Sequence, residues 1–135
     1  RIEHHAFLSY SRNDSNSMHR IRQELAQNNV SACTDEKIRF GFRSWKRSIE
    51  KAILATGCIV CLLSPDANES EWVRAELEFA EMQGIPIFLV LLKGGEKQSI
   101  PFGYATFQWI DLRNPSNYEA GLQNLIETVK YQLKL

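Results

Sequence analysis

The chain is 135 residues long, which fits one domain with a substantial buried core. It carries 16 basic and 16 acidic residues, so no net charge attracts nucleic acid or an anionic membrane. No apolar run is long enough to cross a bilayer, and no signal peptide is recognisable. We therefore expect residues 1–135 to form a single cytoplasmic domain, excised from a longer protein, with no nucleic-acid or membrane partner.

The three cysteines, Cys33, Cys58 and Cys61, all lie in apolar, strand-like runs. Cys58 and Cys61 have the spacing of a redox or zinc pair, but no second pair and no nearby histidine accompany them. In a strand, two residues at this spacing point to opposite faces. We interpret the cysteines as small buried hydrophobic residues, which suits a reducing cytosol, and we predict no metal site.

The first part of the chain alternates strand-like and helical patterns. Residues 5–10 predict a buried strand, and a polar turn then leads into a helix with apolar residues at helical spacing. The asparagines at 28–29 end that helix, and residues 30–33 predict a short second strand. A charged loop with aromatic residues follows at 35–43, and Ser44 is placed to cap a further helix.

The second part continues the alternation. Residues 57–63 are apolar throughout, which is typical of a strand covered on both faces in a parallel sheet. A similar strand is predicted at 85–92, with a loop at 93–97 and a short fifth strand at 107–110. A Ser-x-x-Glu capping box at 116–119 marks the start of the last helix.

Five strands alternating with helices predict an α/β fold, an open parallel sheet with helices on both faces. In such folds ligands bind beyond the carboxyl ends of the strands, at the point where the strand order reverses. The loops expected at that end of the sheet are 11–14, 34–43, 64–70 and 93–104.

A predicted helix at 68–80 carries the most informative residue. Asn68 is placed as its N-cap, with Glu71 at the spacing of a capping box. The helical neighbours of Glu76 are all apolar: Trp72, Val73, Phe79 and Ala80. A carboxylate in these surroundings is either the floor of a pocket or a core-edge residue bonded to backbone amides. Both interpretations stay open on the pattern alone.

The chain lacks the nucleophile elbow, the P-loop and the dinucleotide-binding fingerprint. The pocket interpretation joins the Glu76 carboxylate to aromatic side chains, namely Trp72, Tyr10, Phe42 and Trp45. Aromatic faces stack on planar or cationic rings, and a carboxylate stabilises positive charge that develops on an anomeric carbon. Three arginines, Arg12, Arg39 and Arg43, are suited to bind phosphate oxygens. These residue types indicate a nucleotide-sized ligand whose glycosidic bond is broken.

Four segments resemble, in the same order, conserved segments of Toll/interleukin-1 receptor (TIR) domains. Residues 7–14 read Phe-Leu-Ser-Tyr-Ser-Arg-Asn-Asp and are similar to the first TIR box. Residues 41–45, Gly-Phe-Arg-Ser-Trp, resemble the BB loop and the start of the helix after it. Residues 62–65 and 70–77 resemble the L-S-P and S-x-W-x-x-x-E-L segments.

The resemblance implies a flavodoxin-like open five-stranded parallel sheet. It also implies the activity of many bacterial, plant and some animal members, which cleave NAD+ at the nicotinamide–ribose bond in immune or toxin-like signalling. Their products are nicotinamide and ADP-ribose or a cyclic form, so NAD+ is a substrate and no cofactor is expected. By position, Glu76 would be catalytic, and the substrate-binding residues would be Trp72, Tyr10, Ser11, Arg12, Phe42 and Trp45.

The resemblance also places a self-assembly loop, the BB loop, at Phe40, Gly41, Phe42 and Arg43. Enzymatic family members often complete their site with a neighbour's BB loop. In this chain Phe40 replaces the usual proline before the glycine. The aromatic tip of the loop, formed by Phe40 and Phe42, is either an exposed assembly contact or packs locally against Trp45. The alternative to an enzyme is a non-catalytic adaptor that binds other TIR domains through this loop. A third interpretation is a sensor that binds the nucleotide without turnover.

Overall fold

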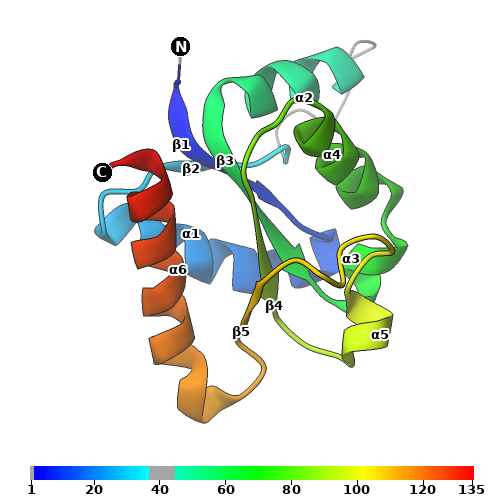
Figure 1. Cartoon of the computed structure of the whole chain (residues 1–135), viewed down its shortest axis with the longest axis vertical. Coiled ribbons are helices and arrows are strands. Elements are labelled where there is room, and N and C mark those ends of the chain that lie inside the picture. Colours follow the sequence, from blue (N-terminus) through cyan, green and yellow to red (C-terminus); the bar gives the residue numbers. More distant parts are fainter. Residues whose placement is uncertain (1, 37–44) are drawn as a thin grey trace.

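Five parallel strands form one sheet in the order β2-β1-β3-β4-β5 (Figure 1). The computed structural model describes residues 2–36 and 45–135. The strands are β1 (His4–Ser9), β2 (Ala32–Cys33), β3 (Thr56–Leu63), β4 (Ile87–Leu91) and β5 (Trp109–Asp111). This is the flavodoxin-like strand order, so the predicted α/β fold is confirmed.

Helices cover both faces of the sheet, as the sequence predicts (Figure 1). Helices α1 and α6 pack on one face, and α2 and α4 pack on the other. The helical elements are η1 (Arg12–Asp14), α1 (Ser15–Gln27), α2 (Trp45–Leu54), α3 (Pro65–Glu69), α4 (Glu71–Met82), α5 (Glu96–Ser99), η2 (Pro115–Asn117) and α6 (Tyr118–Leu133). Among the described residues, no helix is both long and apolar enough to cross a membrane.

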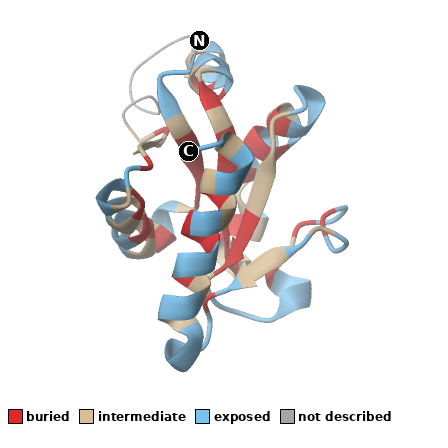
Figure 2. Ribbon diagram, turned by 60° about the vertical axis from the view of Figure 1, so that its left-hand side comes forward, coloured by how far each residue is buried: buried red, intermediate tan, exposed pale blue. Residues whose placement is uncertain are grey.

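The central strand β3 is buried on both faces, which explains its unbroken apolar sequence (Figure 2). Its side chains alternate, so that Cys58 packs with α1 and α6 while Cys61 packs with α4. The opposite orientations of these cysteines are confirmed, and both thiols are free. Burial raises the pKa of the Cys58 thiol to about 12, which keeps it protonated and unreactive at neutral pH.

The segment between β3 and α4 differs from its prediction. A short helix, α3, occupies the predicted turn, and the Ser64 hydroxyl accepts a hydrogen bond from the Ala67 amide at 3.0 Å. Helix α4 begins at Glu71 with Ser70 as its N-cap, so the predicted N-cap at Asn68 is wrong. Ser70 has an extended backbone that ends α3, and its Oγ accepts from the amide of Val73 at 3.2 Å.

Two elements near the carboxyl terminus also differ. The predicted loop at 93–97 contains the start of α5. The predicted capping box at 116–119 is not formed, because a short 3-10 turn precedes α6. There the side chain of Asn114 caps the turn, accepting from the amide of Ser116 at 3.0 Å. A local Asn side chain therefore takes the role that the pattern assigned to Ser116.

Candidate active site between α2 and α4

Glu76 lies in the second turn of α4 and faces the sheet. The residue is 3% exposed, although it is a carboxylate. Its Oε1 accepts a hydrogen bond of 2.7 Å from the hydroxyl of Ser9, the last residue of β1. Ser9 is itself fully buried. A side chain of the sheet therefore anchors the carboxylate at the carboxyl end of β1.

A pocket of about 450 Å³ opens between α2 and α4, and Glu76 contributes to its wall. Two tryptophans stand beside this carboxylate: Trp72 precedes it by one helical turn, and Trp45 begins α2. Their ring centroids are 4.0 Å apart, with an angle of 36° between the planes. The other lining residues are Lys46, Ile49, Glu50, Ile53, Glu71, Ala75 and Phe79.

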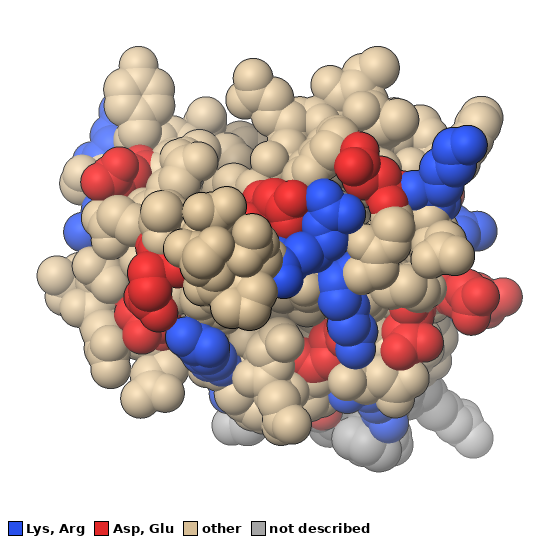
Figure 3. Space-filling model, turned by 90° about the horizontal axis from the view of Figure 1, so that it is seen from below, with Lys and Arg blue, Asp and Glu red and all other residues tan. Residues whose placement is uncertain are grey.

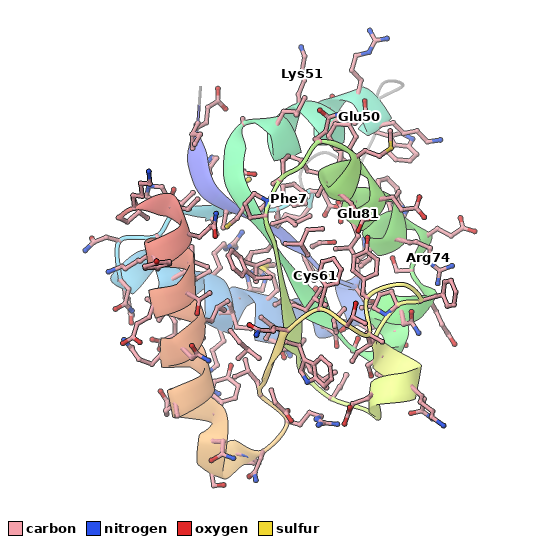
Figure 4. The ribbon with its side chains drawn as sticks, in the orientation of Figure 1. Phe7, Glu50, Lys51, Cys61, Arg74 and Glu81 are labelled. Atoms are coloured by element: carbon pink, nitrogen blue, oxygen red, sulfur yellow. The ribbon has the colours of Figure 1, made fainter. Side chains whose placement is uncertain are left out.

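The charged groups of the pocket are mostly acidic. Glu50 on α2 (Figure 4) and Glu71 at the start of α4 are exposed at its rim, while Glu76 is buried. Lys46 is the one cation among the described lining residues, and its Nζ lies 5.4 Å from the centroid of the Trp45 ring. Aromatic walls with carboxylates suit a planar, positively charged group better than an anionic one.

The described part of the site combines a carboxylate with aromatic rings. Residues 2–36 and 45–135 contain no group of three or more His, Cys, Asp or Glu residues that could hold a metal ion. The arrangement therefore offers a buried carboxylate beside aromatic rings, which can stabilise a developing positive charge in a site of low polarity.

Comparison with known proteins decides the family. A model of the TIR domain matches residues 6–126, which is most of the chain. The chain belongs to the TIR domain family. No curated protein sequence gives a significant match.

Solved structures agree with this family at the level of the fold. The TIR domain of the Toll-related receptor TRR-2 from Hydra magnipapillata has a TM-score of 0.78 at 15% identity, over 94% of this chain and 98% of that one. The TIR domains of the activated Roq1 resistosome, which recognises the pathogen effector XopQ, give 0.68 at 17%, over 94% and 99%. A prokaryotic SEFIR domain gives 0.72 at 12% identity, over 94% and 92%.

The TIR domain brings three of the predicted site residues together, namely Glu76, Trp72 and Trp45. It does not bring Tyr10 to them. Tyr10 is 3% exposed and packs with α1 and α6, on the face of the sheet opposite α4. Adjacent strand residues point to opposite faces, and Ser9 takes the face of Glu76. The predicted contact between Tyr10 and the pocket is therefore not formed.

The remaining predicted site residues do not line this pocket in the described part of the TIR domain. Ser11 caps η1, since its Oγ accepts from the amide of Asn13 at 3.3 Å. Arg12 lies in the exposed turn η1. The predicted BB loop, including the predicted substrate-binding residue Phe42, lies outside the described residues: Phe40, Gly41, Phe42 and Arg43.

The crevice expected where β1 and β3 end is occupied by the protein's own side chains. Asp14 is 3% exposed there, and its carboxylate accepts from the hydroxyl of Ser64. The Nζ of Lys93 lies 3.1 Å from its other oxygen. Figure 3 shows that on the face seen from below basic side chains lie near the centre with acidic side chains around them. The pocket instead lies to one side, between α2 and α4.

Sequence reasoning missed Ser9, the hydrogen-bond partner of Glu76. The available signal was a hydroxyl directly after the apolar residues 6–8, two residues after the buried Phe7 and therefore on the same face. It also missed the acidic rim formed by Glu50 and Glu71, because ordinary exposed helix positions carry such residues in most proteins.

Proposed function

We propose that this TIR domain acts in the cytoplasm as an NAD+ glycohydrolase or cyclase. In this proposal it breaks the nicotinamide–ribose bond and releases nicotinamide with ADP-ribose or cyclic ADP-ribose. The observation that carries the proposal is the buried carboxylate of Glu76, which borders the pocket one turn after Trp72. This is also the carboxylate that the W-x-x-x-E segment of NAD+-cleaving relatives would supply.

The burial of Glu76 favours a functional role. Removing a carboxylate from water is unfavourable, and the hydrogen bond from Ser9 offsets part of that cost. A leucine at the same helical position would bury apolar area at no such cost. Buried ionisable groups in pockets are common at active sites, where their charge is used.

The chemistry assigns each group a task. The nicotinamide of NAD+ is a planar cation, which suits the rings of Trp45 and Trp72 and the acidic rim. As the bond from ribose C1′ to the ring nitrogen breaks, the bonding electron pair leaves with nicotinamide and positive charge develops on the ribose. The Glu76 carboxylate stabilises that charge. Water then attacks C1′ and loses a proton to give ADP-ribose, or an adenine nitrogen attacks to give the cyclic product.

The test is product analysis of concentrated or clustered protein incubated with NAD+. We expect wild type to release nicotinamide and Glu76→Ala to release none. The matched control is Glu78→Ala, because Glu78 lies on the same helix but is exposed and outside the pocket lining. Its activity should equal that of wild type. Wild-type protein that stays inactive when forced to assemble would contradict the proposal.

A second candidate function is a non-catalytic adaptor that associates with other TIR domains. It is favoured by the similarity to TIR domains that were solved within an activated resistosome. Under this function, Phe42→Ala or Gly41→Pro abolishes association, whereas Glu76→Ala changes nothing. Light scattering of these variants measures association, and nicotinamide release measured on the same samples distinguishes the two functions, because only the enzyme has a cleavage activity to lose when Glu76 is replaced.

A further inference from the structure

We propose that Ser9 is a positioning residue for Glu76, whose buried hydroxyl holds the carboxylate in one orientation and in its charged form. This inference rests on the proposed function of Glu76. Ser9 does not belong to the pocket lining, so its effect on a ligand passes through the carboxylate that it contacts. Ser9 ends the strand β1 and belongs to the segment that resembles the first TIR box, but that resemblance assigned it no role.

The geometry of the contact is well suited to orienting a side chain. The hydroxyl of Ser9 lies 2.7 Å from Oε1 of Glu76, within the range of a hydrogen bond to a charged acceptor. Ser9 is 0% exposed and Glu76 is 3% exposed, so water competes little for the bond. In such surroundings a hydrogen bond is stronger than at the surface.

Ser9 is held by the sheet, whereas Glu76 belongs to a helix that packs on it. In the register of β1 and β3, Ser9 lies directly opposite Cys61. The Cys61 thiol is buried next to both side chains: burial raises its pKa, the Glu76 charge raises it further, and a hydrogen bond with Ser9 lowers it. The serine therefore ties a side chain of α4 to the centre of the sheet, where the backbone is rigid.

The hydrogen bond also affects protonation. A donor to a carboxylate favours its charged form over the protonated one. The other titratable or charged described groups that face this carboxylate or line the pocket are Cys61 on β3, Lys46 and Glu50 on α2, and Glu71 on α4. These groups remain in place when Ser9 is changed. Loss of the hydroxyl should therefore move the acid limb of the activity–pH profile to higher pH.

The chain offers a matched control at the other buried serine–carboxylate pair. The hydroxyl of Ser64 donates to Oδ2 of Asp14, and Ser64 is 0% exposed. Neither residue lines the pocket. Ser64→Ala thus removes the same kind of bond and also a helix cap, so its cost in stability should be at least that of Ser9→Ala, without an effect on a positioned Glu76.

The experiment compares NAD+ cleavage by wild type, Ser9→Ala, Ser9→Thr, Ser64→Ala and Glu76→Ala, with melting temperatures measured in parallel. We expect Ser9→Ala to lower kcat roughly tenfold to a hundredfold, as small losses of alignment do. KM should change by less than about twofold, because the pocket walls are intact. The acid limb of the kcat–pH profile should move to higher pH for Ser9→Ala and for none of the other active variants. Ser9→Thr keeps a hydroxyl and should recover part of kcat.

The outcomes separate this inference from the proposed function. If wild type is inactive, both fail. A second case is that wild type is active and Glu76→Ala is inactive, while Ser9→Ala behaves like Ser64→Ala. In that case only the positioning inference is overturned. A Ser9→Ala variant that loses kcat in proportion to its folded fraction, with an unchanged pH profile, would also overturn it and leave the function standing.

Discussion

Glu76 and Leu77 are neighbours in α4, and both are buried. Their side chains differ in what burial does to the stability of the fold. Leu77 packs with β3 and β4 in an apolar cluster, so its burial stabilises the fold. Glu76 must be desolvated on folding, and its carboxylate accepts a hydrogen bond from the hydroxyl of Ser9. At the scale of single residues, burial alone does not distinguish packing from function, but the chemistry of the buried group does.

This contrast can be measured by urea unfolding. Glu76→Gln keeps the shape of the side chain and an oxygen that accepts from Ser9, so the free energy of unfolding should stay within about 1 kcal/mol of wild type. Cleavage should be lost with the charge. Leu77→Ala should cost about 2–5 kcal/mol, since it opens a cavity in a packed cluster. A large loss of stability for Glu76→Gln would show that the carboxylate is structural.

At the scale of elements, the two tryptophans connect α2 to α4, and the start of α4 determines where Glu76 lies. Helix α4 follows α3 after a single residue, Ser70, which takes an extended conformation. Starting the helix at Glu71 places Glu76 in the second turn, facing Ser9. The exact cap therefore matters for the site, although the helix itself follows from the apolar spacing in the sequence.

We expect Ser70→Ala to lower the free energy of unfolding by about 0.5–2 kcal/mol, because the amide of Val73 loses its acceptor. Ser70→Asp should retain most of the stability, since a carboxylate accepts the same bond and suits the positive end of the helix dipole. Chemical denaturation of the three proteins measures both effects. Equal stability of Ser70→Ala and wild type would show that Ser70 is not the cap.

At the scale of the whole molecule, the flavodoxin-like sheet sets the position of the pocket. The pocket lies on the face covered by α2 and α4, while the end of β1 and β3 is closed by Asp14, Ser64 and Lys93. The pocket has a volume of about 450 Å³, a mostly apolar lining and charged groups that are mostly acidic. In the proposed function this pocket holds the nicotinamide–ribose end of NAD+, and the phosphates need contacts from elsewhere. The family resemblance predicts that a neighbouring TIR domain completes the site.

If assembly completes the site, nicotinamide release per molecule of protein should rise with protein concentration. We expect Gly41→Pro to remove this rise, because it alters the predicted assembly loop, while its melting temperature stays near that of wild type. Activity assays across a dilution series, with light scattering on the same samples, provide the measurement. Specific activity that stays constant over the whole series would mean that a single domain suffices.

Much of this TIR domain could be predicted from its sequence. The unbroken apolar run of β3 indicated a parallel sheet covered on both faces, because such a strand has no solvent side. The W-x-x-x-E spacing put Trp72 and Glu76 on one helical face, because residues four apart are neighbours on a helix. The pocket interpretation grouped Trp45 with Trp72 and Glu76, and the ring centroids of the two tryptophans lie 4.0 Å apart.

Only the tertiary structure decided which distant side chains meet. Local periodicity predicts the face of a helix or strand on which a side chain lies, but not what packs on that face. The contact of Ser9 with Glu76 joins residues 67 positions apart, and it depends on how α4 lies across β1. The same packing placed Tyr10 on the other face of the sheet and closed the expected crevice with Asp14. Long-range packing, which no short pattern encodes, buries the Glu76 carboxylate at the pocket wall and brings it to the hydroxyl of Ser9.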